Sequence, residues 1–430
     1  MLPYYHTFET IIHNNPLKVA PDTNQGNTMK HNIFTLLSAI LASTSMLFAE
    51  SGTCGDNATW DLTDGVLTIS GTGAMSDYDF RTTFTPWEPQ VKSITSVVVS
   101  NGITHIGDNA FRNCENVASF TLPNSLTTIG VSAFEWCHKL TSIEIPNGVE
   151  SIGEYAFYDC SAMTSISIPA TLKRIDDLVF NYCTALTTVY LSDIAAWCAV
   201  EIGLGSNPMS YGQYIYLNGE LLTDLVIPES VTSISHQAFF ACTSLKSLTI
   251  GNNVTTIRDQ AFSGCEGLTS ITFGSSVTTI EYDAFAWCKS LTSVTIPNTI
   301  TNLESGLFMG CEGLTSLTIG NSVASIGDNA FFDCTSLKEV TCLAVTPPTM
   351  GEEVFAEVDC SKIPLFVPAQ SVAAYKAADQ WKAFNPIVED GKQDVEMVSE
   401  ETKDSRKFIR DGQIFIHRGG QTYTLTGQQL

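Results

Sequence analysis

Nine cysteines recur in this chain at intervals of 23 residues, in two runs. A thiolate can form a disulfide, bind a metal ion or act as a nucleophile, so a fixed spacing of this residue type raises all three chemistries. A Phe lies three residues before each Cys, and Leu, Val or Met lies three residues after it. The nine positions are Cys114, Cys137, Cys160, Cys183, Cys242, Cys265, Cys288, Cys311 and Cys334.

The cysteines form one column of a longer internal repeat. Six and eight residues after each Cys there is an apolar pair, such as Ile143/Ile145, and a Pro or Gly usually follows it. This alternation has the period of a β-strand, which the Pro or Gly ends. One such unit cannot bury its apolar side alone, whereas stacked units can. The sequence therefore predicts a β-rich repeat solenoid of about twelve short parallel strands, with a hairpin cap at its N-terminal end and a small helical cap at its C-terminal end.

Within such a stack, the sequence argues against each chemical use of the cysteines. The column would place the thiols ~4.8 Å apart, which alone permits disulfides, but all of them point the same way and the total of 13 is odd. A zinc ion needs about four converging ligands, and one Cys per turn does not supply them. Val91 and Val358 occupy the equivalent positions near the two ends. We expect the nine thiols to be structural core residues, free, buried and unreactive.

The composition restricts the classes of function. The chain has 430 residues, with 45 acidic and 21 basic side chains. This excess of negative charge disfavours binding to nucleic acid or to an anionic membrane surface. A Cys137–His138 pair is the one candidate nucleophile and base, but no other repeat offers a base in register. Phosphate-binding loops, metal-ligand pairs and nucleophile elbows are absent from the sequence, so we expect no enzyme, no cofactor and no metal.

The repeat resembles a known family. The unit "LTSIEIPNGVESIGEYAFYDC" (140–160) is similar to the leucine-rich repeats of BspA-like bacterial surface proteins, and the similarity covers roughly residues 90–345. Residues 54–79 and 365–384 look like the terminal parts of such proteins. The resemblance implies a secreted or surface-exposed, non-catalytic interaction protein, often an adhesin of anaerobic bacteria. In several repeats the Gly after Ile is replaced, by Asp176 and Arg258 for example, which is compatible with the fold.

The N-terminal residues indicate export. Residues 29–49 are typical of a secretory signal peptide, because a basic start after Met29 is followed by an apolar centre and by a small residue at Ala49. A buried helix is the alternative. No other long apolar run exists, so we expect no transmembrane segment in the mature chain. The expected organisation is an upstream extension (1–28), a signal peptide (29–49), an N-terminal cap (50–90), the solenoid (91–345) with an insertion at 192–222, a C-terminal cap (346–388), a linker (389–407) and a candidate C-terminal sorting tail (408–430).

Two segments interrupt this organisation. Between Val189 and Leu225 there are 13 residues more than one repeat, and an insertion of this kind usually forms a loop on one face, either a binding loop or a locally packed bulge. Residues 408–430 alternate around Gly419-Gly420 in the manner of a hairpin, and are similar to C-terminal sorting tails of secreted Bacteroidetes proteins. An ordinary terminal hairpin is the alternative.

The residues expected to bind a partner face outward from the strands or belong to the insertion. The outward strand column is rich in Ser and Thr, which either keep an exposed sheet soluble or offer a broad, weakly charged binding surface. We expect contact with an extracellular protein, in the manner of an adhesin, or with a polysaccharide, in a glycan-binding or nutrient-capture module. The candidates are Glu144, Tyr190, Thr249 and Thr272 on the strands and Trp197, Tyr211, Tyr214 and Tyr216 in the insertion.

Overall fold

The computed structural model describes residues 50–210, 214–390, 405–410, 413–418 and 421–424, with side chains up to residue 390. The proposed extension, the proposed signal peptide, Tyr211 and most of the proposed linker lie outside these residues.

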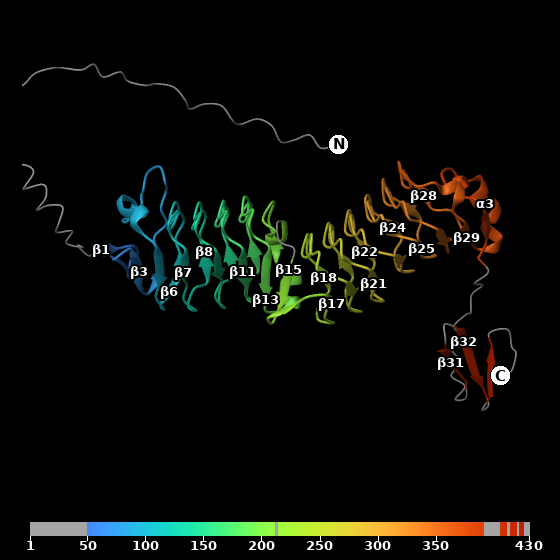
Figure 1. Cartoon of the computed structure of the whole chain (residues 1–430), viewed down its shortest axis with the longest axis horizontal. Helices are drawn as coiled ribbons and strands as arrows, with labels where there is room; N and C mark the ends of the chain where they lie inside the picture. Colours follow the sequence, from blue (N-terminus) through green and yellow to red (C-terminus); the bar gives the residue numbers. More distant parts are fainter. Residues whose placement is uncertain (1–49, 211–213, 391–404, 411–412, 419–420, 425–430) are drawn as a thin grey trace, which may run out of the picture. The chain divides into compact units, whose positions relative to one another are not determined.

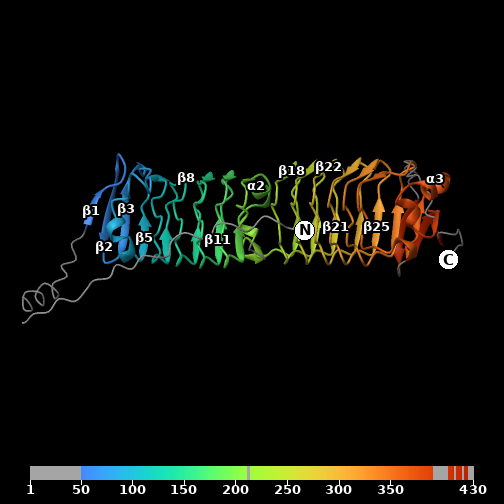
Figure 2. The ribbon, with the colours of Figure 1, turned by 90° about the horizontal axis from the view of Figure 1, so that it is seen from above.

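Residues 50–390 form a β-solenoid in which each turn contributes one strand to each of two rows (Figure 1). Seen from above, β5, β11 and β21 follow one side of the stack and β8, β18 and β22 the other (Figure 2). Neighbouring strands within a row are parallel in nearly every case, as the sequence predicted for a repeat stack. The first row contains β5 (Ser96–Val99), β7 (Ser119–Thr121), β9 (Ser142–Glu144), β11 (Ser165–Ile168), β13 (Thr188–Leu191), β15 (Tyr214–Leu217), β17 (Asp224–Val226), β19 (Ser247–Thr249), β21 (Ser270–Thr272), β23 (Ser293–Thr295), β25 (Ser316–Ile319), β27 (Glu339–Cys342), β29 (Leu365–Val367) and β30 (Ile387–Glu389).

The second row consists mostly of two-residue strands. These strands carry the Ile that closes each repeat, such as Ile129 and Ile152, and this side chain points into the core. The row contains β4 (Gly73–Ala74), β6 (Ile103–Ile106), β8 (Thr128–Ile129), β10 (Ser151–Ile152), β12 (Arg174–Ile175), β14 (Glu201–Ile202), β18 (Ser233–Ile234), β20 (Thr256–Ile257), β22 (Thr279–Ile280), β24 (Asn302–Leu303), β26 (Ser325–Ile326) and β28 (Thr349–Met350).

The third side of each turn is the Ala-Phe-x-x-Cys segment, which we call the turn face. Its backbone also joins successive repeats: the Phe134 N–H donates to Ala156 O (2.7 Å) and the Trp136 N–H to Tyr158 O (2.9 Å). Most repeats are thus fixed to the next by backbone hydrogen bonds on three sides, which satisfies polar groups that a buried stack could not leave unpaired. Strand pairing stops between β7 and β9, between β21 and β23, and between β22 and β24, where the turn face keeps its backbone bonds.

A stack of phenylalanine rings runs through the core. Phe134 and Phe157 lie parallel with ring centroids 5.0 Å apart, and Phe262, Phe285 and Phe308 continue the pattern at 5.4 Å. These side chains are fully buried. One identical ring per repeat can stack in this way because every repeat presents the same residue at the same depth.

Both ends of the stack are covered by tryptophan. At the N-terminal end, Trp87 stacks on the first Phe of the column, Phe111, with Trp60 edge-on against it. The hairpin expected around Trp60 is formed there by β2 (Ala58–Thr63) and β3 (Val66–Gly71), with β1 (Glu50–Thr53) and the 3₁₀ helix η1 (Glu88–Ser93). At the other end, Trp381 and Phe384 pack edge-on against Phe355, the last ring of the stack. This cap contains η3 (Cys360–Lys362), η4 (Ala369–Ser371), α3 (Val372–Ala377) and η5 (Trp381–Ala383).

The insertion differs from the expectation of a loop. Helix α2 (Ile194–Cys198), β14, η2 (Pro208–Ser210) and β15 form another turn of the solenoid, because Ile215 of β15 takes the place of an inward strand residue. A short antiparallel strand, β16 (Glu220–Leu221), then closes this sheet before β17 begins the next one. Among the described residues, β14 does not pair with β18, nor β16 with β17.

We call this break between β16 and β17, together with the break between β14 and β18, the seam. The Phe stack is interrupted here, and hydrogen bonds from side chains bridge the two halves. Trp197 Nε1–H donates to Ala238 O (2.7 Å), and Asn207 Nδ2–H donates to Gln237 O (2.5 Å). A backbone bond from Ser235 N–H to Cys198 O (3.0 Å) crosses the seam as well.

The C-terminal residues form a separate small sheet. Strands β31 (Ser405–Arg410), β32 (Gln413–Arg418) and β33 (Gln421–Thr424) are antiparallel. In the part of the chain that the structure describes, no helix is long and apolar enough to cross a membrane.

Candidate interaction surfaces

Four of the residues expected to bind a partner lie on one sheet. The pairing of β9, β11, β13 and β15 places Glu144, Ser167, Tyr190 and Tyr216 side by side in a single row. Tyr214 lies on β15, two residues before Tyr216, and so faces outward as well. Residues far apart in the sequence therefore converge because each turn advances the chain by one strand.

The tyrosines at the end of this row form an exposed patch. The rings of Tyr190 and Tyr216 lie 5.3 Å apart, and Tyr190 and Tyr214 are 40% and 41% exposed. Two aliphatic side chains that the sequence analysis missed lie on the strands that follow: Leu221 (41% exposed) on β16 and Val226 (63% exposed) on β17. Val226 occupies an outward position where most other repeats have Ser or Thr, and this difference is visible in the sequence. We call these five side chains the tyrosine patch.

Beyond the seam, the threonines that precede the strands have a structural role. Thr249 and Thr272 are exposed neighbours on β19 and β21, in the sheet that begins with β17. Thr249 therefore pairs with Val226 of the tyrosine patch, whereas the three tyrosines lie on the sheet before the seam. The threonines just before the strands donate to the backbone of the preceding repeat, as in Thr269 Oγ1–H to Lys246 O (2.9 Å) and Thr315 Oγ1–H to Thr292 O (2.9 Å). These hydroxyls join repeats and are not free for a ligand.

The expectation that Trp197 contacts a partner is wrong. Its side chain is 1% exposed, and its Nε1–H is already bonded to Ala238 O. The indole fills the core of the solenoid turn that the insertion forms, where the repeated Phe and Cys residues are missing. Within the insertion, Tyr214 and Tyr216 remain available.

The repeat cysteines form a buried hydrogen-bonded column. All nine side chains are fully buried and none is in a disulfide. Most thiols donate to the carbonyl of the Phe in the preceding repeat, as in Cys160 Sγ–H to Phe134 O (3.2 Å) and Cys265 Sγ–H to Phe239 O (3.2 Å). Burial raises the pKa of the Cys137 and Cys265 thiols well above the usual value of 9.0. A protonated thiol that is buried is a poor nucleophile and a poor metal ligand.

The repeats identify the family. A profile of the BspA type leucine rich repeat region matches in six copies, over residues 90–196, 209–338 and 301–373, which together make up more than half of the chain. The chain belongs to the BspA-type leucine-rich repeat family. No curated protein matches the sequence.

Several solved bacterial structures are similar to this BspA-type chain. A leucine-rich repeat protein from Eubacterium ventriosum has 24% identity and a TM-score of 0.45, over 72% of this chain and 95% of that one. A leucine rich cell surface protein from Faecalibacterium prausnitzii has 25% identity and a TM-score of 0.37, over 68% and 94%. The pneumococcal vaccine antigen PcpA has 17% identity and a TM-score of 0.42, over 76% and 95%.

One cluster near the start of the BspA-type repeats has the composition of a metal site. Ligand atoms of Asp77, His105 and Asp108 lie within 4.8 Å of one another. However, Asp77 Oδ1 accepts the Asp108 N–H (2.9 Å) and Asp108 Oδ1 accepts the Val131 N–H (2.6 Å). The equivalent Asp177 and Asp328 accept backbone N–H groups in the same way without a histidine nearby. The carboxylates therefore act as backbone caps of the BspA-type turn.

The structure also separates Cys137 from His138, the candidate nucleophile and base. Cys137 is buried and donates to Phe111 O (3.4 Å), whereas His138 Nε2 lies 3.4 Å from Asp159 Oδ2 at the surface. The thiol and the imidazole thus have different partners, and they do not form the nucleophile–base pair that the sequence raised.

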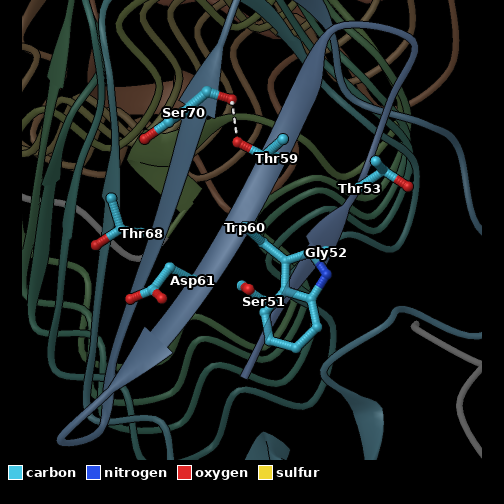
Figure 3. A pocket seen from close by; sticks show the side chains of 8 residues that line it. All are labelled: Ser51, Gly52, Thr53, Thr59, Trp60, Asp61, Thr68 and Ser70. Atoms are coloured by element: carbon cyan, nitrogen blue, oxygen red, sulfur yellow. Dashed lines mark hydrogen bonds between the residues drawn. The ribbon is translucent and has the colours of Figure 1, made fainter. Parts of the chain in front are cut away.

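A shallow hollow lies on the N-terminal cap, outside the BspA-type repeats. It has a volume of about 440 Å³, and the Trp60 ring lies beside Gly52 in it (Figure 3). Thr59 Oγ1–H donates to Ser70 O (3.5 Å) across its floor. Its single ionisable group is Asp61, so its lining offers no acid–base pair. The lining residues are Ser51, Gly52, Thr53, Thr59, Trp60, Asp61, Thr68 and Ser70.

Proposed function

We propose that this chain is a secreted or cell-surface interaction protein, adhesin-like and without catalytic activity, that binds a protein of a host or neighbouring cell through the tyrosine patch. The observation that carries the proposal is the exposure of Tyr190 and Tyr214 together with Leu221 and Val226. Exposed aromatic and aliphatic groups that adjoin one another mark interaction sites on soluble proteins.

The chemistry of the patch suits a protein partner. Tyrosine combines a large apolar ring with a polar tip, and it is enriched among the residues that dominate binding energy. Around the patch, the sheet carries Ser, Thr and Glu144, which can form the polar rim that surrounds such a centre. Family membership supports the surface location, because BspA-like repeats are typical of bacterial surface proteins.

The test is binding of the purified chain to immobilised extracellular matrix proteins. The variant Tyr190→Ser/Tyr216→Ser gives both positions the residue type of other repeats, so it should fold normally. Loss of two central aromatic contacts should weaken binding about 30-fold or more, which is the effect of a hot spot. The matched control, Thr295→Ser/Thr318→Ser on β23 and β25, lies on a sheet that holds no residue of the tyrosine patch and should bind as the unsubstituted chain does.

Two outcomes would contradict the proposal. One is unchanged affinity in the tyrosine variant. The other is absence of matrix-protein binding together with retention on polysaccharide, which would favour a glycan-binding or nutrient-capture module. Fractionation of the producing cells tests the location separately, and recovery of the chain in the cytoplasm would remove the basis for an adhesin.

A further inference from the structure

A second aromatic surface lies on the turn face, away from the strand rows. Tyr155, Tyr158 and Tyr182 belong to two successive repeats, and their rings touch edge-to-face. The ring centroids of Tyr155 and Tyr158 are 5.4 Å apart, and those of Tyr158 and Tyr182 are 5.2 Å apart, both at 71°. Tyr182 is 51% exposed and the other two are half-buried. We call these three side chains the turn-face tyrosines.

Two of these tyrosines have a backbone conformation that their type disfavours. Tyr155 has φ +57° and Tyr182 has φ +62°, in the left-handed region where bulky side chains are rarely found. The left-handed conformation recurs at the position of Tyr182 in every regular repeat, with residues as different as Gly264, Asn113 and Trp287, so it is a property of the repeat. The fold does not require tyrosine at either position.

The neighbouring repeat shows what such a surface can hold. The guanidinium of Arg112 lies 4.3 Å from the ring centroid of Phe80 and 4.3 Å from that of Trp136. Arg112 Nε also forms an ion pair with Glu135 Oε2 at 2.8 Å. One cation is therefore held between two aromatic rings and a carboxylate. Trp136 adjoins the turn-face tyrosines, because its N–H donates to Tyr158 O.

The turn-face tyrosines have the same surroundings without a cation from this chain. Partial burial raises the pKa of the Tyr155 and Tyr158 hydroxyls, and nearby carboxylates raise it further. These are Glu154, Glu135 and Asp177 for Tyr155, and Asp159 and Glu135 for Tyr158. Glu154 forms no ion pair with any residue of the described chain, and Asp159 contacts the imidazole of His138. Among the described side chains, the cation–π contacts are those of Arg81 and Arg112, and neither reaches these three rings.

We propose that the turn-face tyrosines and their carboxylates bind arginine side chains of a partner protein's basic segment. A guanidinium can stack on an exposed ring and reach a carboxylate in the same pose, as Arg112 does within this chain. The net charge of −24 favours a basic partner over an acidic one. This surface goes beyond the proposed function, since it lies on a different side of the solenoid from the tyrosine patch.

The experiment uses the full chain and a fluorescent peptide of alternating arginine and glycine, with a lysine–glycine peptide for comparison. At about 0.15 M salt, where distant charges are largely screened, the arginine peptide should bind several-fold more tightly than the lysine peptide. The variant Tyr155→Asn/Tyr182→Asn should lose about tenfold in affinity for the arginine peptide. Equivalent positions already have Asn109 and Asn113, so this variant should fold.

The matched control is Trp287→Asn, at the position equivalent to Tyr182 in a distant repeat, with φ +60°. It should leave the affinity unchanged. If the double variant is not folded, Tyr182→Gly alone provides the same comparison. The proposal would be overturned if both peptides bind equally well and none of the substitutions changes their affinity. That result would indicate diffuse electrostatic attraction to an acidic chain. Tyrosine-dependent retention on a neutral polysaccharide, without any loss for the arginine peptide, would also overturn it. Substitutions in the tyrosine patch should not change this affinity, so the two proposals can fail separately.

Discussion

Raising the pH should destabilise the solenoid through its cysteine column. Burial raises the thiol pKa of seven of the nine repeat cysteines, Cys114, Cys137, Cys160, Cys242, Cys265, Cys288 and Cys334, above the usual 9.0. Above pH 9 the unfolded chain therefore releases protons that the folded chain retains. Because the unfolded state then binds fewer protons, the free energy of unfolding falls as the pH rises.

The magnitude follows from the number of thiols. At one pH unit above the unfolded pKa, each protonated thiol in the fold costs about 1.4 kcal/mol of stability. For Cys242 only a modest rise applies, and the other six thiols would together remove about 8 kcal/mol, close to the whole stability of a typical domain. Below pH 8 the same groups are protonated in both states, so they should give no pH dependence there.

The assay is urea unfolding, followed by circular dichroism, at pH 8 and pH 10 with a reductant present. Cys265→Val provides the control, since it removes one thiol and leaves all tyrosines in place. Valine is suited to this column, because Val91 occupies the equivalent position near one end and is buried. The variant should lose about 1.4 kcal/mol less than the unsubstituted chain between the two pH values. An identical loss in both proteins would show that the folded thiol is not held protonated, which would refute the reasoning.

Two further predictions concern the core. Phe285→Ala removes a fully buried ring that stacks on Phe262 and Phe308, so it should lower the free energy of unfolding in urea by about 3–5 kcal/mol. The control Phe84→Ala, at a side chain that is 58% exposed, should change this free energy by about 0.5 kcal/mol or less. A cost below about 1 kcal/mol for Phe285→Ala would mean that the ring stack contributes little to stability. Trp197→Phe keeps an aromatic ring but leaves Ala238 O without its donor, so it should cost about 1–3 kcal/mol in the same measurement. A neutral effect of Trp197→Phe would mean that water replaces the indole N–H at the seam.

The regular turns could be predicted from the sequence because the same residue types return at the same depth. Phe157 and Cys160 identify a core position in one repeat, and each further copy repeats the evidence. The insertion lacks both columns, since Trp197 and Met209 are buried there in place of the repeated residues. Strand β15 was not predicted there from the sequence, although Tyr214 and Tyr216 alternate with Ile215.

The two proposed binding surfaces were harder to predict, for a physical reason. A row across the sheet joins residues that are one turn apart, such as Tyr190 and Tyr216, and the irregular turn changes that distance in sequence from 23 to 26 residues. Tyr158 and Tyr182 lie between the Phe and the Cys of their repeats, and Tyr155 lies two residues before the Phe. The residue type at these positions differs from repeat to repeat. The available indication was the tyrosine that recurs in two successive repeats, at 155, 158 and 182.

The seam has a mechanical consequence. A solenoid held at one end and pulled at the other carries the load through all its turns in series, so it yields first where the connection between turns is weakest. Regular turns always share the load among the backbone bonds of the turn face. At the seam both rows of strands and the Phe stack are interrupted, and the connection relies on hydrogen bonds made by Trp197, Asn207 and Ser235. Tension would therefore separate the molecule into two blocks before either block unravels, and the tyrosine patch, which spans β13 to β17, would be divided at the same moment.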